Sequence, residues 1–213
     1  MISSDRTPKE SPSRRCKNSS VPRLAAGIAL VLLVSLLVAG SRGADKPSHP
    51  QAWAQRVPST TFKNLYKIDD DIYRSEQPTR RGFEEIRDKG IKTIIDLRFG
   101  HSDAALIEGL DLVLIHVGMT AWDFSEDDIL RALKAIESAP KPVLVHCQYG
   151  SDRTGVVMAM YRIVYQNWPK EEALAEMKEG GFGFHWIYLN IPSFIKRVDV
   201  ARIRKRLGLA QTG

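Results

Sequence analysis

Residues 141–165 read KPVLVHCQYGSDRTGVVMAMYRIVY, and this stretch decides the fold. Pro142–His146 is an apolar run of strand length, and Thr154–Gln166 is long and apolar enough to form a helix. A short polar loop joins the two. In open α/β sheets, ligands bind beyond the carboxyl ends of the strands, where a helix N-terminus offers free N–H groups and a positive dipole end. The loop is therefore predicted to bind an anion.

Cys147 and Arg153 stand at the two ends of this loop, with five residues between them. If the intervening N–H groups curl inward, they coordinate phosphate oxygens while the Arg153 guanidinium holds two more in a bidentate grip. The same donors stabilise a Cys147 thiolate, the nucleophilic form of the side chain. Thr154 can hydrogen-bond the sulfur as it leaves a phosphocysteine intermediate. The other candidate residues of the phosphate-binding loop are His146, Gln148, Tyr149, Gly150, Ser151, Asp152 and Gly155.

Three of these residues are expected to shape the loop. Gly150 and Gly155 suit positions where the chain turns sharply or packs closely against a neighbour. His146 comes directly before the cysteine, and we expect it to brace the loop rather than to act as a base.

The sequence HCQYGSDRTG at 146–155 resembles the H-C-x5-R-[ST] signature of the cysteine-dependent protein tyrosine phosphatase superfamily, and most of all its compact dual-specificity-like bacterial members. The resemblance runs from about Leu65 to Asn190 and includes IYRSEQP and IKTIIDLR. It implies hydrolysis of phosphate monoesters through a phosphocysteine, with no cofactor and no metal. A weakly active phosphate-binding module is the non-enzyme alternative, although a pure binder does not require the thiol.

A phosphatase of this kind needs an acid to protonate the leaving oxygen, which then acts as a base to activate water. The sequence GMTAWDFSEDD at 118–128 is similar to a shortened form of the family's W-P-D loop, with Trp122 and Asp123 present and the proline absent. Asp123 is the leading candidate for the acid. Asp152 is the alternative, because some lipid phosphatases of the superfamily carry an aspartate just before the loop arginine.

Strands and helices alternate along the rest of the domain, which predicts an α/β fold with a central, mostly parallel twisted sheet flanked by helices. The expected strands are 61–67, 72–74, 91–97, 112–117 and 142–146. The expected helices are 79–89, 102–108, 125–138, 154–166, 169–178 and 185–197.

Charge is distributed unevenly along the 213 residues, whose net charge is +6. The segments 1–23 and 196–206 are strongly basic, so the rest of the chain is mildly acidic. This pattern argues against nucleic-acid binding, which relies on a basic surface. The 196–206 segment is expected to be a solvated helix face, with attraction to anionic lipid head groups as the alternative.

The sequence LAAGIALVLLVSLLVAG at 24–40 contains no charge and indicates either a cleaved signal peptide or a retained membrane anchor. The excess of Lys and Arg before it predicts export of the domain, in a bacterium to the periplasm. Cys147 would then have no disulfide partner, because Cys16 precedes the apolar run. The predicted organisation is a basic region at 1–23, the signal or anchor at 24–40, a linker at 41–60, the phosphatase domain at 61–197 and a basic tail at 198–213.

The sequence leaves the substrate class open between a phosphoprotein and a lipid, sugar or inositol phosphate. Arg74 and Arg98 could reach the substrate side of the sheet, although bracing of loops is the favoured interpretation. Trp168 and the aromatic run FGFHW at 182–186 are expected to serve core and cap packing, with an aromatic at the rim of the pocket as the alternative for this run.

Overall fold

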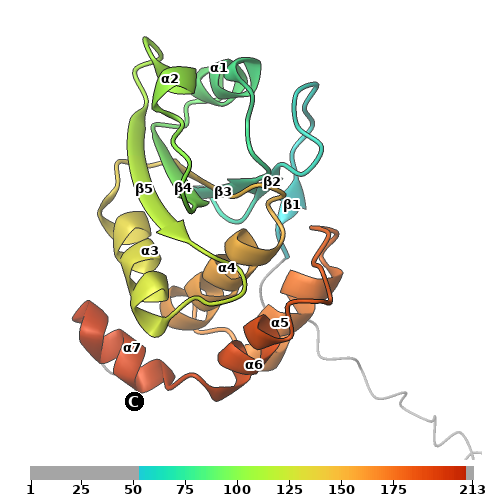
Figure 1. Cartoon of the computed structure of the whole chain (residues 1–213), viewed down its shortest axis with the longest axis vertical. Helices are drawn as coiled ribbons and strands as arrows, with labels where there is room; N and C mark the ends of the chain where they lie inside the picture. Colours follow the sequence, from blue (N-terminus) through green and yellow to red (C-terminus); the bar gives the residue numbers. More distant parts are fainter. Residues whose placement is uncertain (1–52, 210–213) are drawn as a thin grey trace, which may run out of the picture. The chain divides into compact units, whose positions relative to one another are not determined.

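The computed structural model describes residues 53–209 as a six-stranded sheet flanked by helices (Figure 1). The strand order is β1-β2-β3-β6-β4-β5; β3, β6, β4 and β5 pair in parallel, and β1 and β2 add antiparallel pairings at one edge. The strands are β1 (Gln55–Arg56), β2 (Tyr66–Lys67), β3 (Ile72–Ser75), β4 (Thr93–Arg98), β5 (Val113–Met119) and β6 (Val143–His146). The predicted α/β fold with a mostly parallel sheet is confirmed.

Helices cover both faces of the sheet. Helices α1 (Arg80–Asp88) and α2 (Ala104–Ile107) lie on one face, and the other helices lie on the opposite face around α4 (Figure 1). These are α3 (Glu126–Ser138), α4 (Asp152–Tyr165), α5 (Lys170–Glu179), α6 (Asn190–Arg197) and α7 (Val200–Leu207). Helix α4 follows β6 after a short loop, so its N-terminal end lies near the end of that strand, where the anion site is predicted.

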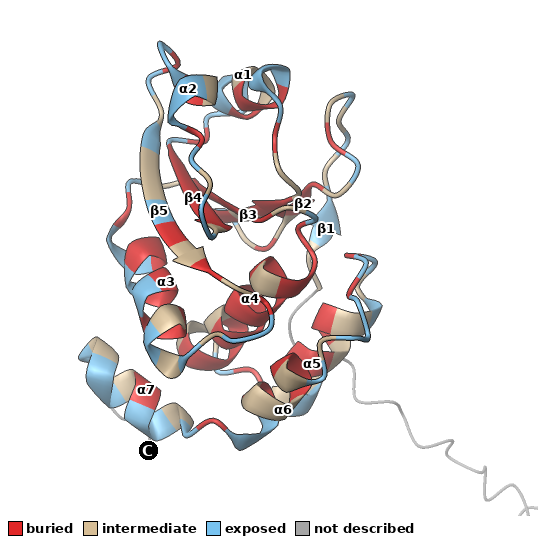
Figure 2. Cartoon of the chain, viewed as in Figure 1, coloured by how far each residue is buried: buried red, intermediate tan, exposed pale blue. Residues whose placement is uncertain are grey.

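Strand β6 lies between β3 and β4 in the sheet, and Figure 2 shows both of these neighbours as largely buried. Val143 and Val145 pack into the hydrophobic cluster that includes α3 and α4, whereas Leu144 packs with Phe83 and Ile86 of α1. Side chains alternate between the two faces of a strand, and both faces are covered here. The strand therefore needs a continuous apolar sequence, which is the signal that identified it.

Local sequence signals set the ends of two helices. The Thr79 side chain accepts a hydrogen bond from Gly82 N at the start of α1, and Ser125 and Asp128 form a capping box at the start of α3. Such caps satisfy N–H groups that have no partner inside the helix. Both helix starts agree with the sequence-based expectation.

A buried ion pair joins α4 to α5. Arg162 Nε and Nη2 donate to the Glu176 carboxylate at 2.9 and 2.6 Å, and Glu176 also accepts from Ala54 N at 2.7 Å. The Arg162 guanidinium lies 4.1 Å from the centre of the Trp168 ring. Removing one member of such a pair is costly because it leaves a buried charge uncompensated. The pair therefore ties α4 to α5.

Ordered structure extends beyond 61–197 at both ends. Gln55–Arg56 forms β1 within the segment predicted as a linker, and Val200–Leu207 forms α7 within the predicted basic tail. Ile203 of α7 is fully buried, while Arg206 pairs with Glu126 and Asp127 of α3. The apolar and ionic contacts of α7 explain why this basic segment packs as a helix.

Three predicted elements are clearly shorter in the structure, and one of them is the helix expected at 102–108, which spans only Ala104–Ile107. The strand expected at 61–67 is confined to Tyr66–Lys67, because Lys63 N and Asn64 N donate to the Glu76 carboxylate instead of to a neighbouring strand. The helix expected at 185–197 begins at Asn190. Before it, the chain is held in a turn by hydrogen bonds from His185 to the Asp152 carboxylate.

Residues 1–52 and 210–213 lie outside the described part of the chain. The predicted basic region at 1–23, the apolar segment at 24–40 and most of the linker fall there. Within 53–209, none of the helices has both the length and the apolar character needed to cross a bilayer.

Candidate active site

The segment 146–155, which we call the phosphate loop, leaves the sheet at the carboxyl end of β6. Ser75 of β3 and Asp96 of β4 stand beside His146 in the strand register. The chain segments that follow these three parallel strands therefore emerge at one edge of the sheet. Helix α4 begins at Asp152, so its free N-terminal N–H groups belong to the same region.

Three successive carbonyl oxygens of the phosphate loop are held from outside. The bonds are Gln77 N to Gln148 O (3.3 Å), Asn64 Nδ2 to Tyr149 O (2.8 Å) and Arg74 Nη2 to Gly150 O (2.6 Å). In a planar trans peptide, the carbonyl and the following N–H point in opposite directions. The N–H groups of Tyr149, Gly150 and Ser151 therefore point into the loop, and no acceptor within 53–209 engages them. Inward N–H groups of this kind form an anion-binding nest.

Gly150 is required by the geometry of the phosphate loop. Its φ is +69°, in the left-handed region, and a Cβ at this position would lie 2.5 Å from the backbone carbonyl of Ser75. Both the conformation and the close backbone approach exclude a side chain. At Gly155, a Cβ would lie 3.1 Å from Met177 Cγ, so the first turn of α4 packs tightly on α5.

Cys147, Arg153 and Thr154 lie together on this short segment. The Cys147 side chain is buried, with 2% of its surface exposed. Arg153 is half-buried, and its side chain makes no hydrogen bond or ion pair with any residue of 53–209. Thr154 Oγ1 is buried and lacks a hydrogen-bond partner in the same range. A thiol, a guanidinium and a hydroxyl are thus left unengaged by the fold around the inward N–H groups.

Arg74 places a buried positive charge behind the loop. It is 1% exposed, its guanidinium lies 3.7 Å from the centre of the Phe182 ring, and it donates to Gly150 O. Burial lowers the pKa of Arg74 to about 10, while the interactions with Glu176 and Cys147 act in the opposite direction. Arg74 therefore stays cationic at neutral pH and is electrostatically coupled to Cys147, and it braces the loop as the sequence analysis favoured.

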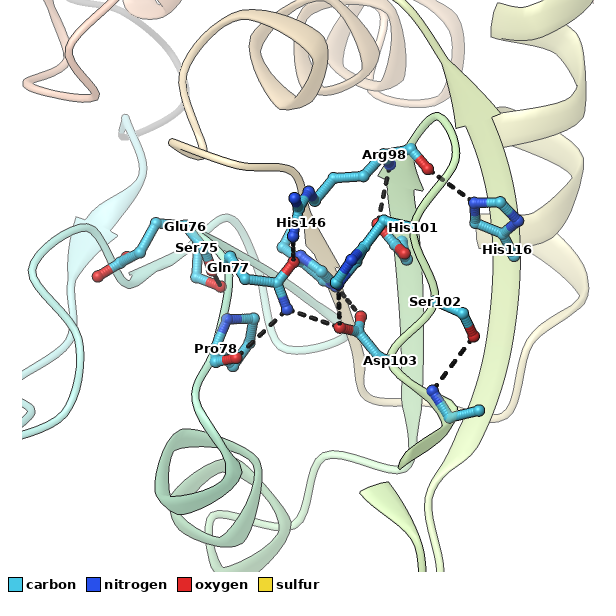
Figure 3. A network of polar contacts seen from close by, with 12 residues as sticks. Ser75, Glu76, Gln77, Pro78, Arg98, His101, Ser102, Asp103, His116 and His146 are labelled. Carbon is cyan, nitrogen blue, oxygen red and sulfur yellow. Dashed lines mark hydrogen bonds and ion pairs between the residues drawn. The ribbon is translucent and has the colours of Figure 1, made fainter. Parts of the chain in front are cut away.

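A buried polar network supports the phosphate loop from the side of α1 and α2 (Figure 3). The Asp103 carboxylate is bonded to His146 Nε2 (2.8 Å), Gln77 Nε2 (2.6 Å) and His101 Nε2 (3.1 Å). Burial acts to raise the pKa of Asp103, but the bonds from His146, Gln77 and His101 bring it below its ordinary value. Asp103 is thus the charged group that orients His146, directly before the cysteine.

Asp96 lies in the same network but is less well satisfied. Its Oδ1 accepts from Arg98 N at 2.8 Å, its Oδ2 has no partner within 53–209, and burial raises its pKa. Possible metal-ligand atoms of Asp96, Asp103 and His146 lie within 4.8 Å of one another. Because Asp103 already holds three donors, we interpret the group as a hydrogen-bonded support. Arg98 Nη1 donates to Gln77 Oε1 at 2.7 Å and braces this network too.

Asp123 lies on the loop between β5 and α3, where its exposed side chain bonds to no described residue. The backbone beneath it is fixed: Asp123 N donates to Thr120 Oγ1 at 3.1 Å, and this hydroxyl donates to Asp123 O at 3.0 Å. Asn190 Nδ2 donates to the carbonyls of Ala121 and Trp122 at 2.8 and 3.1 Å. The carboxylate is therefore free of protein partners on a loop that is tied to α6.

The Asp152 carboxylate, unlike that of Asp123, is buried and hydrogen-bonded within the protein. The residue is 5% exposed, and its two carboxylate oxygens accept hydrogen bonds from His185 N at 3.0 Å and His185 Nδ1 at 2.8 Å. These contacts also hold the chain in the turn that delays the start of α6. The carboxylate of Asp152 is thus engaged with a histidine from the segment that precedes α6.

One exposed aromatic side chain belongs to the phosphate loop, and another belongs to the loop that carries Asp123. Tyr149 is 61% exposed, and its ring meets the His185 ring edge-on at 5.4 Å. Trp122, next to Asp123, is 59% exposed and lies 4.5 Å from the Tyr188 ring. Aromatic surface is therefore exposed both on the phosphate loop and beside Asp123.

The run FGFHW divides between core packing and the surface near the phosphate loop. Phe182 and Phe184 are buried, but Trp186 is 65% exposed and His185 faces the phosphate loop. The glycines at 181 and 183 have positive φ, and this backbone turns successive side chains in different directions.

Four residues of the site were not identified from the sequence: Asn64, Gln77, Asp103 and His185. Gln77 follows β3 directly, and a polar residue at the carboxyl end of a strand is a usable signal. No sequence signal marks Asp103 or His185, because their partners His146 and Asp152 lie 43 and 33 residues away.

Comparisons with known proteins agree with this geometry. Residues 52–187 match the family described as DSP-PTPase phosphatase fused to NAD+ kinase. The chain is 32% identical to the dual specificity protein phosphatase TpbA of Pseudomonas aeruginosa, over 85% of this chain and 81% of that protein. The crystal structure of a TpbA variant in complex with pTyr superposes with a TM-score of 0.67 at 30% identity, covering 76% of this chain and 99% of that one. The inositol diphosphatase DSP3 of Arabidopsis thaliana is 26% identical over 68% of this chain and 74% of that protein.

Proposed function

The chain belongs to the dual-specificity phosphatases of the cysteine-dependent protein tyrosine phosphatase superfamily, and we propose that Cys147 is its nucleophile, with Arg153 and the inward N–H groups of the phosphate loop as the phosphate-binding groups. The observation that carries this assignment is the outward pinning of three successive loop carbonyls, which turns the N–H groups of Tyr149, Gly150 and Ser151 inward around Cys147. A nest of donors stabilises both the thiolate and the charge of the transferring phosphoryl group.

In the first step, the Cys147 thiolate attacks phosphorus. The S–P bond forms while the P–O bond to the substrate breaks, and the leaving oxygen takes the electron pair of that bond. We assign Asp123 as the acid that protonates this oxygen, because its carboxylate has no protein partner whereas Asp152 is held by His185. In the second step, water hydrolyses the phosphocysteine and releases phosphate. Thr154, whose Oγ1 has no partner within 53–209, donates to the departing sulfur.

Phosphotyrosine is the substrate class that best fits the phosphate loop and the side chains around it. The five residues between Cys147 and Arg153 include no Lys, Arg or His and do include Asp152. A substrate with many phosphates, such as an inositol polyphosphate, requires several cations at the mouth of its site. Tyr149 and Trp122 instead present exposed aromatic surfaces, which suit a phosphorylated phenol.

A substrate panel tests this proposal. The comparison is between one peptide carrying phosphotyrosine, the same peptide carrying phosphoserine, and an inositol diphosphate, with Cys147→Ser as the inactive control. We expect the highest kcat/KM for phosphotyrosine and competitive inhibition by vanadate. A higher kcat/KM for the inositol diphosphate would contradict the substrate assignment while leaving the nucleophile assignment intact.

We also propose that the catalytic domain works outside the cytoplasm. The support is the uncharged segment at 24–40, with more Lys and Arg before it than after it. Whether the segment is cleaved or retained as an anchor is decided by the size of the mature chain in the membrane and soluble fractions. A reporter that becomes active only after export should be active when it is fused after Gly213. Activity of a reporter that works only in the cytoplasm would contradict this assignment.

A further inference from the structure

His185 and Asp152 form a histidine–carboxylate pair on the rim of the phosphate loop. The carboxylate is buried, and it accepts from both the backbone N–H and the ring Nδ1 of the same histidine. The imidazole itself is only half-buried, since 47% of its side-chain surface is exposed. One end of the pair is therefore fixed within the protein, and the other end is open to solvent.

The segment that carries His185 is fastened to the phosphate loop at several points. Phe182 O accepts from Ser151 Oγ at 2.7 Å and from Asn64 Nδ2 at 3.0 Å. A Cβ at Gly183 would lie 3.4 Å from Ser151 Oγ, so the backbone runs directly along the loop. The edge-on contact with the Tyr149 ring adds a further restraint. His185 thus keeps a fixed position relative to the loop that would carry the phosphoryl group.

The hydrogen-bond pattern also sets the tautomer of His185. A carboxylate can only accept, so Nδ1 must carry the proton that it donates to Asp152. In the neutral ring, Nε2 then holds a lone pair, and no residue of 53–209 occupies it. A histidine that is oriented by an aspartate and presents a free ring nitrogen is the arrangement of a general base.

We propose that His185 is the base that activates water for the second step, the hydrolysis of the Cys147 phosphocysteine. The proposal rests on the proposed function, because it requires that intermediate. It separates two roles that a single aspartate would otherwise fill: Asp123 protonates the leaving group in the first step, and His185 deprotonates water in the second. Asp152 acts as the positioning residue, since it orients the ring.

His185 Nε2 accepts a proton from water as the water oxygen forms a bond to phosphorus. The P–S bond breaks, and its electron pair returns to Cys147 as the thiolate. Inorganic phosphate leaves, and the imidazolium, stabilised by the Asp152 carboxylate, later releases its proton to solvent.

Pre-steady-state kinetics with p-nitrophenyl phosphate tests the assignment, because this substrate forms the phosphocysteine without help from an acid. His185→Gln in the full chain should show a burst of about one p-nitrophenol per chain, a kcat lowered by about 10²-fold and an unchanged kcat/KM. The phosphocysteine should accumulate and be recovered after rapid quenching. Asp152→Asn should give the same pattern with a smaller loss.

Two control variants sharpen the test. His116→Gln removes an exposed histidine whose ring bonds only to a backbone carbonyl, and it should leave all rates unchanged. Asp123→Asn should not accumulate phosphocysteine from p-nitrophenyl phosphate. Accumulation in Asp123→Asn but not in His185→Gln would overturn the proposal and assign the base to Asp123.

Further outcomes separate catalysis from structural support. If kcat and kcat/KM fall together in His185→Gln without a burst, His185 only supports the loop and the proposal fails. Should this variant be unstable by thermal melting, His185→Ala provides the second test, since added imidazole should restore phosphate release from its phosphocysteine. Absence of rescue would count against the base. Absence of phosphocysteine in every variant and in the wild type would contradict the proposed function itself.

Discussion

The phosphate loop is supported on two sides, and the two supports differ in kind. Towards α1 and α2, Asp103 and His146 are fully buried and hydrogen-bonded to each other. Towards the segment before α6, Asp152 is buried but its partner His185 is half exposed, and the neighbouring Tyr149 is 61% exposed. The first support fixes the loop, whereas the second presents groups to substrate and water. Rigidity and chemistry are thus divided between the two sides of one loop.

The largest effect should come from the loop cation that stands between the two supports. Arg153→Lys should lower kcat by about 10³-fold, because one ammonium cannot reproduce the planar bidentate contact and removal of each such donor costs about 10²–10³-fold. The measurement is steady-state turnover of p-nitrophenyl phosphate, with circular dichroism to check folding. A loss below tenfold would show that the inward N–H groups bind the phosphoryl group without Arg153.

A somewhat smaller effect is expected on the exposed side at Asp123. Asp123→Asn should lower kcat for an alkyl phosphate by about 10²–10³-fold, because an alkoxide is a poor leaving group without an acid. The loss should be much smaller for p-nitrophenyl phosphate. Equal losses for the two substrates would contradict the role of Asp123 as the acid, and a leaving-group-dependent loss in Asp152→Asn would move that role into the loop.

In the buried network towards α1 and α2, two isosteric substitutions should change the free energy of unfolding in opposite directions. Asp103→Asn should lower the free energy of unfolding at pH 7 by about 3 kcal/mol, because it breaks a buried charged partnership. The pKa of Asp103 is lowered in the folded state, so its contribution is present above the ordinary Asp pKa and is lost as the pH falls through the folded value. The difference between Asp103→Asn and wild type should therefore shrink in acid.

Asp96→Asn should change the free energy of unfolding with the opposite sign. The pKa of Asp96 is raised by burial, so the protonated form favours folding and this contribution is lost as the pH rises through the folded value. The neutral amide should consequently raise the free energy of unfolding at pH 7, with a gain that disappears as the pH falls towards the ordinary Asp pKa. Urea titrations at several pH values measure both variants, and a loss of stability in Asp96→Asn at pH 7 would contradict this reading of the network.

The smallest effect is expected at the exposed rim. Tyr149→Ala should raise KM for a phosphotyrosine peptide by about threefold to tenfold, the loss expected for one aromatic contact. Inhibition by inorganic phosphate should not change, since phosphate contacts the loop N–H groups and not the ring. Weaker inhibition by phosphate would show that Tyr149 shapes the loop rather than the substrate surface.

The parts of this site that could be predicted from the sequence are those that are contiguous in it. Cys147, Arg153 and the turn at Gly150 follow from one segment between a strand and a helix, and the apolar runs revealed the parallel sheet. The supports of the loop could not be predicted in this way. Arg74 meets Gly150 across 76 residues, and Asn64 meets Tyr149 across 85 residues. Such contacts depend on strand order and register, which no local pattern specifies.

His185 shows a second limit of local patterns. Its neighbours Phe182 and Phe184 are core residues, and a histidine between apolar residues is usually read as part of the same packing. Positive φ at Gly181 and Gly183 turns the chain so that this one side chain reaches Asp152. The polar contact is a consequence of backbone conformation, which the residue types alone do not specify.

Phosphate esters should be hydrolysed through a phosphoryl group on Cys147, and rapid quenching of the turning-over enzyme should capture that intermediate. Peptide mass spectrometry of the quenched wild type should find one phosphoryl group per chain at most, located on Cys147. Cys147→Ser should be folded, should bind vanadate or phosphate and should show no turnover. Turnover by Cys147→Ser, or hydrolysis by the wild type with the phosphoryl group on another residue, would contradict the account.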